Sequence, residues 1–136
     1  MVYEFSLPIK AFSVNAYHYR DKRHKTAEAR AWEEEVKFLL EEHKPLLDLA
    51  AEHIKLGGEF TVYLNFVYPK HVFYNKIGQV SAKTFDLSNV EKPILDLLFK
   101  ETMGVDDRFV TQIVSSKRAG ASFAIDIKLK LYTNSP

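Results

Sequence analysis

The chain has 136 residues, and this length together with a hydrophobic fraction of 46% suits one domain with a substantial core. It contains no cysteine, which excludes a disulfide framework, a thiolate nucleophile and a zinc–thiolate site. Its formal net charge is only +1, so any contact with nucleic acid must come from a local basic surface and not from the charge of the whole chain.

No segment of the sequence has the character of a membrane span or an export signal. Uncharged apolar stretches fall short of the roughly 18 residues that a transmembrane helix needs. The first ten residues, MVYEFSLPIK, lack the basic flank and the continuous apolar run of a signal peptide. We therefore expect a cytoplasmic protein that has one domain over residues 1–136 and no membrane partner.

The N-terminal part is predicted to form a short strand followed by a long loop. Hydrophobic alternation from Val2 to Leu7 predicts the strand, which Pro8 ends. Residues 9–25 show no regular period, and a loop of that length in a compact domain is typically functional or mobile. Its basic run at positions 18–25 is either a solvated loop or the local basic surface that DNA binding would require.

Two helical stretches are predicted next. Thr26 can N-cap a helix over residues 27–42. The residues expected to be buried on it are Trp32, Val36 and Leu39, and the glutamates at positions 33–35 are expected on its solvated face. Pro45 should interrupt this helix, and a second stretch over residues 46–55 should end at Gly57-Gly58.

A long strand, a second loop and a further helix follow. The strand is predicted over residues 60–68 and the loop over residues 70–84. Ser88 and Glu91 form the pattern of a capping box, which predicts a helix running to about residue 103. Pro93 fits only in a first turn, so the helix could instead begin one or two residues later.

The C-terminal part is predicted to form two strands. They cover residues 108–117 and 122–132 and are joined by the tight turn Arg118-Ala119-Gly120. The predicted order is therefore β-α-β-α-β-β. This order indicates an α+β fold, with a mixed or mostly antiparallel sheet and helices packed on it.

The segment from Lys83 to Lys117 holds the polar residues that could carry chemistry. Asp86 stands at the entrance of the predicted helix, where the helix N-terminus and Lys92 supply positive potential. Two consecutive carboxylates, Asp106 and Asp107, follow the helix. Hard divalent cations such as Mg²⁺ prefer carboxylate oxygens, and such an ion can activate water and stabilise charge on a scissile phosphate.

An ordinary structural role is open for each of these residues. Asp86 could cap the helix, and Asp106 with Asp107 could form a turn. Lys92 and Asp96 have the spacing of an exposed i, i+4 ion pair. Spacing alone leaves both the metal site and these structural roles open.

The same residues carry a resemblance to a known family. The run Asp86-Leu87-Ser88-Asn89-x-x-Lys92 is similar to the D-x-D-N-x-x-K signature of RusA-type Holliday-junction resolvases. The acids that follow also resemble the pattern, with Asp96 four residues after the lysine and Asp106-Asp107 ten residues further on. The N-terminal region is similar too, through Leu7-Pro8, Ser13-x-Asn15-x-x-His18, a basic loop and a helix with Trp32.

This resemblance implies a homodimeric, Mg²⁺-dependent endonuclease, with Mn²⁺ as a possible substitute, that cuts branched DNA and is often encoded by phages or prophages. It implies that Asp86 and Asp107 are catalytic, metal-binding acids, that Asp106 is a further metal-binding acid, and that Lys92 is the catalytic lysine. Ser88, Asn89 and Asp96 would support the site. The residues expected to contact DNA are Asn15, Arg20, Lys22, Arg23, Lys25, Lys83, Lys117 and Arg118.

The chain departs from the family pattern at one position, because Ser88 replaces the second acid of the signature. A neutral hydroxyl is a weaker Mg²⁺ ligand, so the site loses one negative charge. Three outcomes stay open: the metal is held through water and Asp106, the activity is low, or the protein binds junctions without cutting them. A protein-interaction domain that binds no nucleic acid is a further alternative, favoured by the near-neutral charge.

Overall fold

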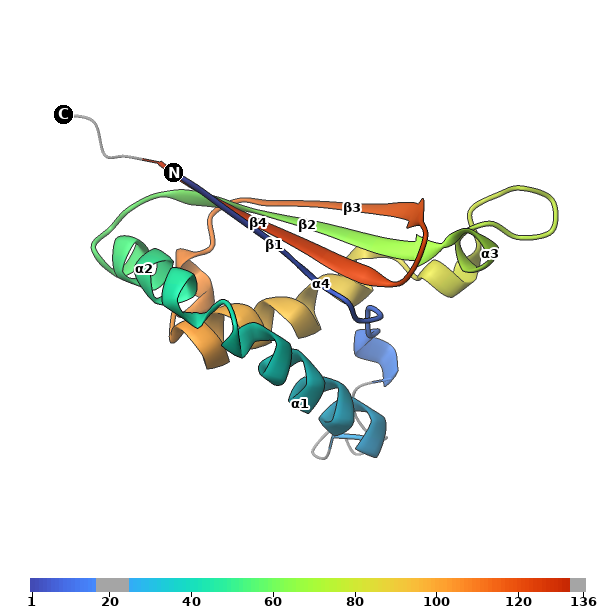
Figure 1. Ribbon diagram of the computed structural model, residues 1–136, viewed down its shortest axis with the longest axis horizontal. Helices are drawn as coiled ribbons and strands as arrows, with labels where there is room; N and C mark the ends of the chain where they lie inside the picture. The colour runs from blue at the N-terminus through green and yellow to red at the C-terminus, as the bar shows by residue number, and fades with distance from the viewer. Residues whose placement is uncertain (17–24, 133–136) are drawn as a thin grey trace.

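A four-stranded mixed sheet forms the base of the fold in the computed structural model, which describes residues 1–16 and 25–132 (Figure 1). The strands are β1 (Val2–Leu7), β2 (Phe60–Pro69), β3 (Ile113–Gly120) and β4 (Ala124–Leu131), and their order in the sheet is β1-β4-β2-β3. Strand β4 runs antiparallel to β1 and β2, whereas β2 and β3 are parallel. The predicted α+β class with a mixed sheet is confirmed.

The main helices all lie on one side of this sheet (Figure 1). They are α1 (Ala27–Glu41), α2 (Lys44–Lys55), α4 (Leu87–Leu95) and the π-helix η3 (Asp96–Met103). Short elements lie in the connections: η1 (Val14–Ala16), α3 (Lys70–Phe73), η2 (Ala82–Thr84) and η4 (Asp107–Phe109). None of the helices within residues 1–16 and 25–132 combines the length and the apolar character needed to span a membrane.

Alternation along β2 and β4 directs apolar side chains toward the helices. On β4, the buried residues are Ile125, Ile127, Leu129 and Leu131, while Lys128 and Lys130 face away. From the helical layer, Ile94, Leu97, Leu98 and Phe99 are fully buried in the same core. This core fixes α4 and η3 beneath the parallel pair β2–β3, and it thereby positions the segment that the sequence analysis singled out.

Helix α1 begins as predicted but buries a different stripe. Thr26 caps it, because its side chain accepts a hydrogen bond from the Ala29 amide at 3.1 Å. Leu40 is buried where Leu39 was expected, and Leu39 is only partly covered. The expectation that Glu33 is solvated was wrong: its carboxylate is buried and both oxygens accept from Lys25 Nζ at 2.9 Å. Burial of the carboxylate is possible because this charge-assisted contact satisfies it.

The helix after Phe85 also differs from its prediction. Its N-cap residue is Asp86 and not Ser88, so the predicted capping box does not form, and Pro93 lies inside the helix. Proline has no amide hydrogen to donate to the previous turn. The α-helical geometry ends at Leu95, and the chain continues as the π-helix η3 until Gly104 adopts a left-handed conformation (φ 65°).

The last two strands begin later than predicted. Residues 107–109 form η4, so β3 starts at Ile113. The expected turn at residues 118–120 was wrong, because these residues stay in β3 and pair with residues 67–69 of β2. Residues 118–120 continue the strand because the parallel strand β2 extends far enough to pair with them. The chain reverses only at residues 121–123.

Candidate active site

A pocket of about 230 Å³ lies between α4 and the connection that leads from η4 into β3. Its polar lining consists of Ser88, Glu91, Lys92, Asp96 and Asp107, and Leu95, Val110 and Ile113 supply its apolar wall. The structure therefore brings four of the predicted site residues around one hollow: Ser88, Lys92, Asp96 and Asp107. Glu91 was considered only for capping, and it adds a third carboxylate to this lining.

Asp86 holds the N-cap position of α4 without capping the helix. Its backbone carbonyl accepts the Asn89 amide at 3.0 Å, but its side chain makes no capping hydrogen bond. The side chains of Thr26, Ser81 and Asp106 all cap their helices, so Asp86 is the exception among these N-caps. The exposed Asp86 carboxylate has no hydrogen bond or ion pair within the described part of the chain. The structural alternative of a capping aspartate does not apply to it.

Asp106 and Asp107 have different surroundings although they are adjacent. The Asp106 carboxylate accepts from the Arg108 amide at 2.9 Å and caps η4, as the turn alternative predicts. Asp107 is the first residue of η4, and its carboxylate makes no hydrogen bond or ion pair with a described residue. Of these two acids, Asp107 is the one on the pocket wall.

Lys92 and Asp96 form an exposed ion pair on the pocket rim. Lys92 Nζ lies 3.5 Å from an Asp96 oxygen, and the two side chains are 65% and 37% exposed. A pair with that exposure contributes at most about 0.5 kcal/mol to folding stability. Folding stability therefore does not depend strongly on this ion pair. The exposed Lys92 ammonium can direct its charge toward a bound anion.

The residue before Asp86 has a strained backbone. Phe85 has φ 60° and ψ 166°, and it is the one non-glycine residue with a positive φ within residues 1–16 and 25–132. Such a conformation costs of the order of 1–3 kcal/mol in a residue with a side chain, and it clusters at functional sites. Lys117 Nζ donates to the Phe85 carbonyl at 2.8 Å and to Thr84 Oγ1 at 3.0 Å.

Tyr68 supports the same segment from β2. Its hydroxyl donates to the Thr84 carbonyl at 2.7 Å, and burial raises the pKa of Tyr68 to about 12. No site role was predicted from the sequence for Tyr68 or Thr84. Thr84 is buried although it lies in a stretch that resembles a polar loop, and its contacts come from strands that are distant in sequence.

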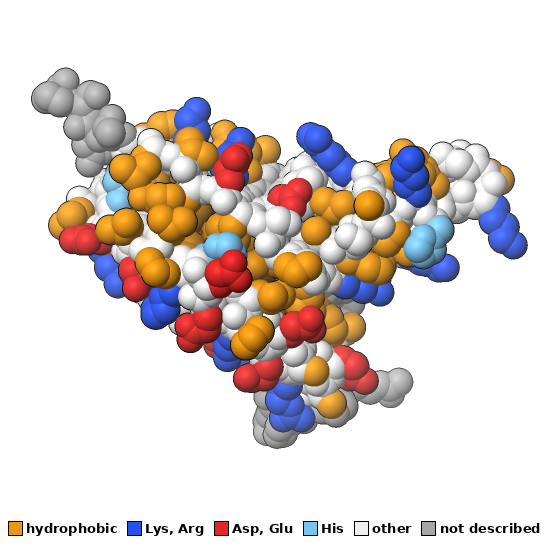
Figure 2. Space-filling view, in the orientation of Figure 1, with side chains coloured by type: hydrophobic (Ala, Val, Ile, Leu, Met, Phe, Trp, Pro, Cys, Tyr) orange, Lys and Arg blue, Asp and Glu red, His pale blue; other side chains and the backbone are white. Residues whose placement is uncertain are grey.

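Of the residues predicted to contact DNA, those that the structure describes do not form one surface. Arg20, Lys22 and Arg23 lie outside the described residues. Lys25 contacts Glu33, Asn15 lies in η1, and Lys83 is exposed in η2. Strand alternation places Lys117 on the helix side and Arg118 on the opposite face of β3. On the face drawn in Figure 2, lysine and arginine side chains are spread along the molecule and interleaved with acidic ones.

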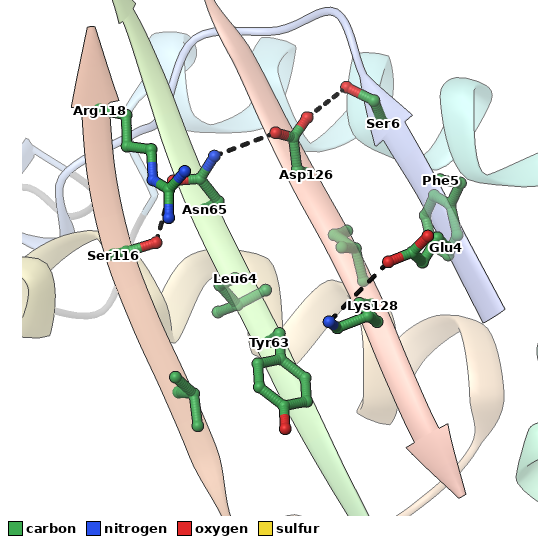
Figure 3. Close-up of a pocket in the computed structure, with 12 residues that line it drawn as sticks. Glu4, Phe5, Ser6, Tyr63, Leu64, Asn65, Ser116, Arg118, Asp126 and Lys128 are labelled. Carbon is green, nitrogen blue, oxygen red and sulfur yellow. Dashed lines mark hydrogen bonds and ion pairs between the residues drawn. The ribbon is translucent and has the colours of Figure 1, made fainter. Parts of the chain in front are cut away.

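The face of the sheet that the helices leave open carries a second, larger hollow and a polar network (Figure 3). The Ser6 hydroxyl donates to Asp126 at 2.7 Å, Asn65 Nδ2 donates to the same carboxylate at 3.0 Å, and Ser116 donates to Asn65 Oδ1 at 2.9 Å. This network crosses all four strands. Asn65 lies among apolar and aromatic residues from Val62 to Tyr68, and that interruption was the available sequence signal.

The chemistry of the donor set suits a hard divalent cation. Such ions take oxygen ligands, and the pocket wall offers the carboxylates of Glu91, Asp96 and Asp107 with the Ser88 hydroxyl. No group of three or more His, Asp or Glu side chains within residues 1–16 and 25–132 is arranged to hold a metal ion. Asp86 and Asn89 are not part of the pocket lining. The fit to such an ion therefore rests on the chemistry of the oxygen donors in the pocket lining and not on their arrangement.

Comparison with known protein families adds independent evidence. Residues 9–130 match the family model described as endodeoxyribonuclease RusA. No curated protein matches the chain. The match covers nearly the whole chain and includes Asp86, Lys92, Asp107 and every other residue of the candidate site. The chain therefore belongs to the RusA family of endodeoxyribonucleases.

Proposed function

We propose that this protein is a divalent-metal-dependent endodeoxyribonuclease that resolves Holliday junctions or related branched DNA. It acts as a homodimer in which each subunit nicks one strand, in the cytoplasm of a bacterial or phage-infected cell. Family membership supports the nuclease activity. The observation that carries the assignment of the site is that neither the Asp86 nor the Asp107 carboxylate has a partner among the described residues, although Asp86 holds the N-cap position of α4 and Asp107 lies in the first turn of η4.

In this proposal Asp86 and Asp107 hold the metal, and Asp106 supports them. Mg²⁺, or Mn²⁺, supplies a Lewis acid and an activated water when it is bound. Lys92 contacts the scissile phosphate and compensates the negative charge that builds on it. Asp96 orients Lys92 through their ion pair, and Asn89 orders the entrance of α4. The positive end of the α4 dipole, at Asp86, favours a phosphate beside it.

The DNA contacts of the proposal come from the basic run near the N-terminus and from two positions later in the chain. Arg20, Lys22, Arg23, Lys25 and Asn15 would bind the DNA backbone, and Lys83 in η2 and Arg118 in β3 would bind further phosphates. Because these contacts are electrostatic, binding should weaken steeply as salt concentration rises. Mutation of one such lysine should weaken binding to all junction sequences alike.

A second candidate function is supported by Ser88. Its hydroxyl lines the same pocket as Asp107, at the position where the family signature has an acid. The site then has one negative charge fewer, and a protein with this loss could bind branched DNA without cutting it. This alternative predicts junction binding in EDTA and no nicks even with Mn²⁺.

One assay separates the two functions. A synthetic four-way junction, labelled on each strand in turn, is incubated with the purified protein in Mg²⁺, in Mn²⁺ and in EDTA, and it is analysed on native and denaturing gels. The nuclease proposal predicts a shifted band in all three buffers and paired, symmetric nicks only with a metal. Binding without nicks would favour the second candidate, and the absence of any salt-dependent binding would contradict both.

A further inference from the structure

The backbone immediately before Asp86 is held in an unfavourable conformation. Phe85 has a positive φ, which residues with a β-carbon rarely adopt. Strained residues of this kind persist only where the surrounding structure holds them. Phe85 is 38% exposed and is not part of the buried core, so core packing does not account for the conformation.

Side chains from two strands hold the peptide groups on either side of this strain. The Thr84 carbonyl accepts from the Tyr68 hydroxyl of β2, and the Phe85 carbonyl accepts from Lys117 Nζ of β3. Lys117 also donates to Thr84 Oγ1, which in turn donates to the Ser81 carbonyl at 2.8 Å. The two carbonyls that precede Asp86 are therefore both fixed by groups outside their own segment.

Lys117 uses its charge for this contact. Its ammonium is bound to uncharged oxygens, and it has no carboxylate partner within the described residues. Hydrogen bonds from a charged donor are stronger than neutral ones. In the register of the parallel pair, Lys117 lies opposite Phe66, and it points to the helix side of the sheet, as Tyr68 does.

We propose that Lys117 is a positioning residue of the nuclease site. With Tyr68, it holds residues 84 and 85 so that the chain enters α4 with the Asp86 carboxylate uncapped and available to a ligand. This inference rests on the proposed function, and it gives Lys117 a role different from the phosphate contact predicted from sequence. Lys117 itself touches neither metal nor DNA in this role.

The first test compares Lys117→Met with Lys130→Met, which removes the charge of an exposed lysine on β4 that pairs with Thr61 at the start of β2. Lys117→Met should lower kcat for junction nicking at least about 10-fold and leave KM and junction affinity unchanged, because the site and not the DNA contact is disturbed. Lys130→Met should leave kcat unchanged. A Lys117→Met protein with weaker junction binding, a smaller salt dependence and an unchanged kcat would overturn the proposal, since a phosphate contact behaves in that way.

The second test asks whether Lys117 acts through the strained residue. Phe85→Ala and Phe85→Gly both remove the ring, but only glycine adopts a positive φ without cost. Lys117→Met should slow nicking about 10-fold in the Phe85→Ala background and less than about 3-fold in the Phe85→Gly background. Equal losses in the two backgrounds would contradict the role.

A third measurement does not depend on activity. The amides of Thr84 and Phe85 donate to the carbonyls of Ser81 and Ala82, each at 3.1 Å. In Lys117→Met their hydrogen exchange should be at least about 10-fold faster, while amides of β2 exchange as in the unmodified protein. Unchanged exchange would overturn the contact's role whether or not the protein is a nuclease. Faster exchange in a protein that never nicks a junction would instead overturn the proposed function, and with it the catalytic part of this assignment.

Discussion

Ser88 in α4 and Asp107 in η4 line the same pocket, although the whole of the π-helix Asp96–Met103 lies between them in sequence. The side chain at position 88 therefore contributes to the same local environment as Asp107. The hydroxyl at this position gives the pocket one negative charge fewer than the family signature would. The strength of metal binding should depend on this position.

Ser88→Asp restores the acid of the signature and should strengthen metal binding. We expect the Mg²⁺ concentration for half-maximal nicking to fall about 10-fold, because a carboxylate is a better Mg²⁺ ligand than a hydroxyl. Titration of nicking rate against Mg²⁺ measures this change, and Ser88→Ala is the matched control that should not produce it. A folded Ser88→Asp protein with a lower rate and a weaker Mg²⁺ response would show that the hydroxyl has a positive role.

Asp107→Asn should remove activity and preserve the fold. Its carboxylate has no partner within the described residues, so the free energy of unfolding should change by less than about 0.5 kcal/mol. Nicking should fall at least about 100-fold, and junction binding in EDTA should be unchanged. Asp48→Asn, which removes a carboxylate of an exposed pair on α2, should keep full activity. Asp86→Asn should behave like Asp107→Asn, and full nicking by the doubly substituted protein would reject both assignments.

Lys92→Gln has a natural control in the same chain. Lys92–Asp96 and Lys44–Asp48 are both exposed i, i+4 pairs, with N–O distances of 3.5 Å and 3.3 Å, but only the first borders the pocket. Lys92→Gln and the control Lys44→Gln should each lower the free energy of unfolding by about 0.5 kcal/mol or less, measured by thermal or urea unfolding. Lys92→Gln alone should slow nicking, by about 10-fold or more, since it removes the charge that we propose faces the scissile phosphate. Equal rates for the two variants would exclude Lys92 from catalysis.

Tyr68 predicts a specific loss of stability in alkali. Burial raises the pKa of Tyr68 to about 12, above its ordinary value of 10.0, so the folded protein keeps this proton where the unfolded chain loses it. The stability that the folded protein gains from keeping this proton is fully present below pH 10. As the pH rises toward 12, the free energy of unfolding should fall by about 2–3 kcal/mol. Urea unfolding across this range should show the loss in the unmodified protein and in Tyr74→Phe, but not in Tyr68→Phe. A Tyr68→Phe protein that destabilises as steeply as the unmodified one would contradict the assignment.

Sequence patterns predicted the fold where one physical signal was dominant. The alternation of Phe60 to Tyr68 and of the last strand was sufficient because each strand buries one face. Thr26 was recognisable because a cap is a local hydrogen bond. The start of β3 and the supposed turn at Arg118 were wrong, because parallel pairing with β2 is a tertiary contact that leaves no local pattern.

The candidate site was predictable to a similar extent. The motif spacing singled out Asp86, Lys92 and Asp107 as candidates, and the structure gathers Lys92 and Asp107 with Ser88 around one pocket. The sequence motif could not reveal that Lys117 donates to the Phe85 carbonyl, because that contact joins positions 32 residues apart. Nor could it separate Asp106, which caps η4, from Asp107, which does not, since both residues have the same chemistry.

The most direct test of the account is to locate the metal. Crystals grown with Mn²⁺ would be measured at a wavelength where manganese scatters anomalously. If Asp86 and Asp107 hold the metal together, one anomalous peak per subunit should lie in contact with a carboxylate oxygen of each residue, either directly or through a single water. A peak bound by only one of these residues, or by other residues of the chain, would contradict the claim that Asp86 and Asp107 hold the metal together.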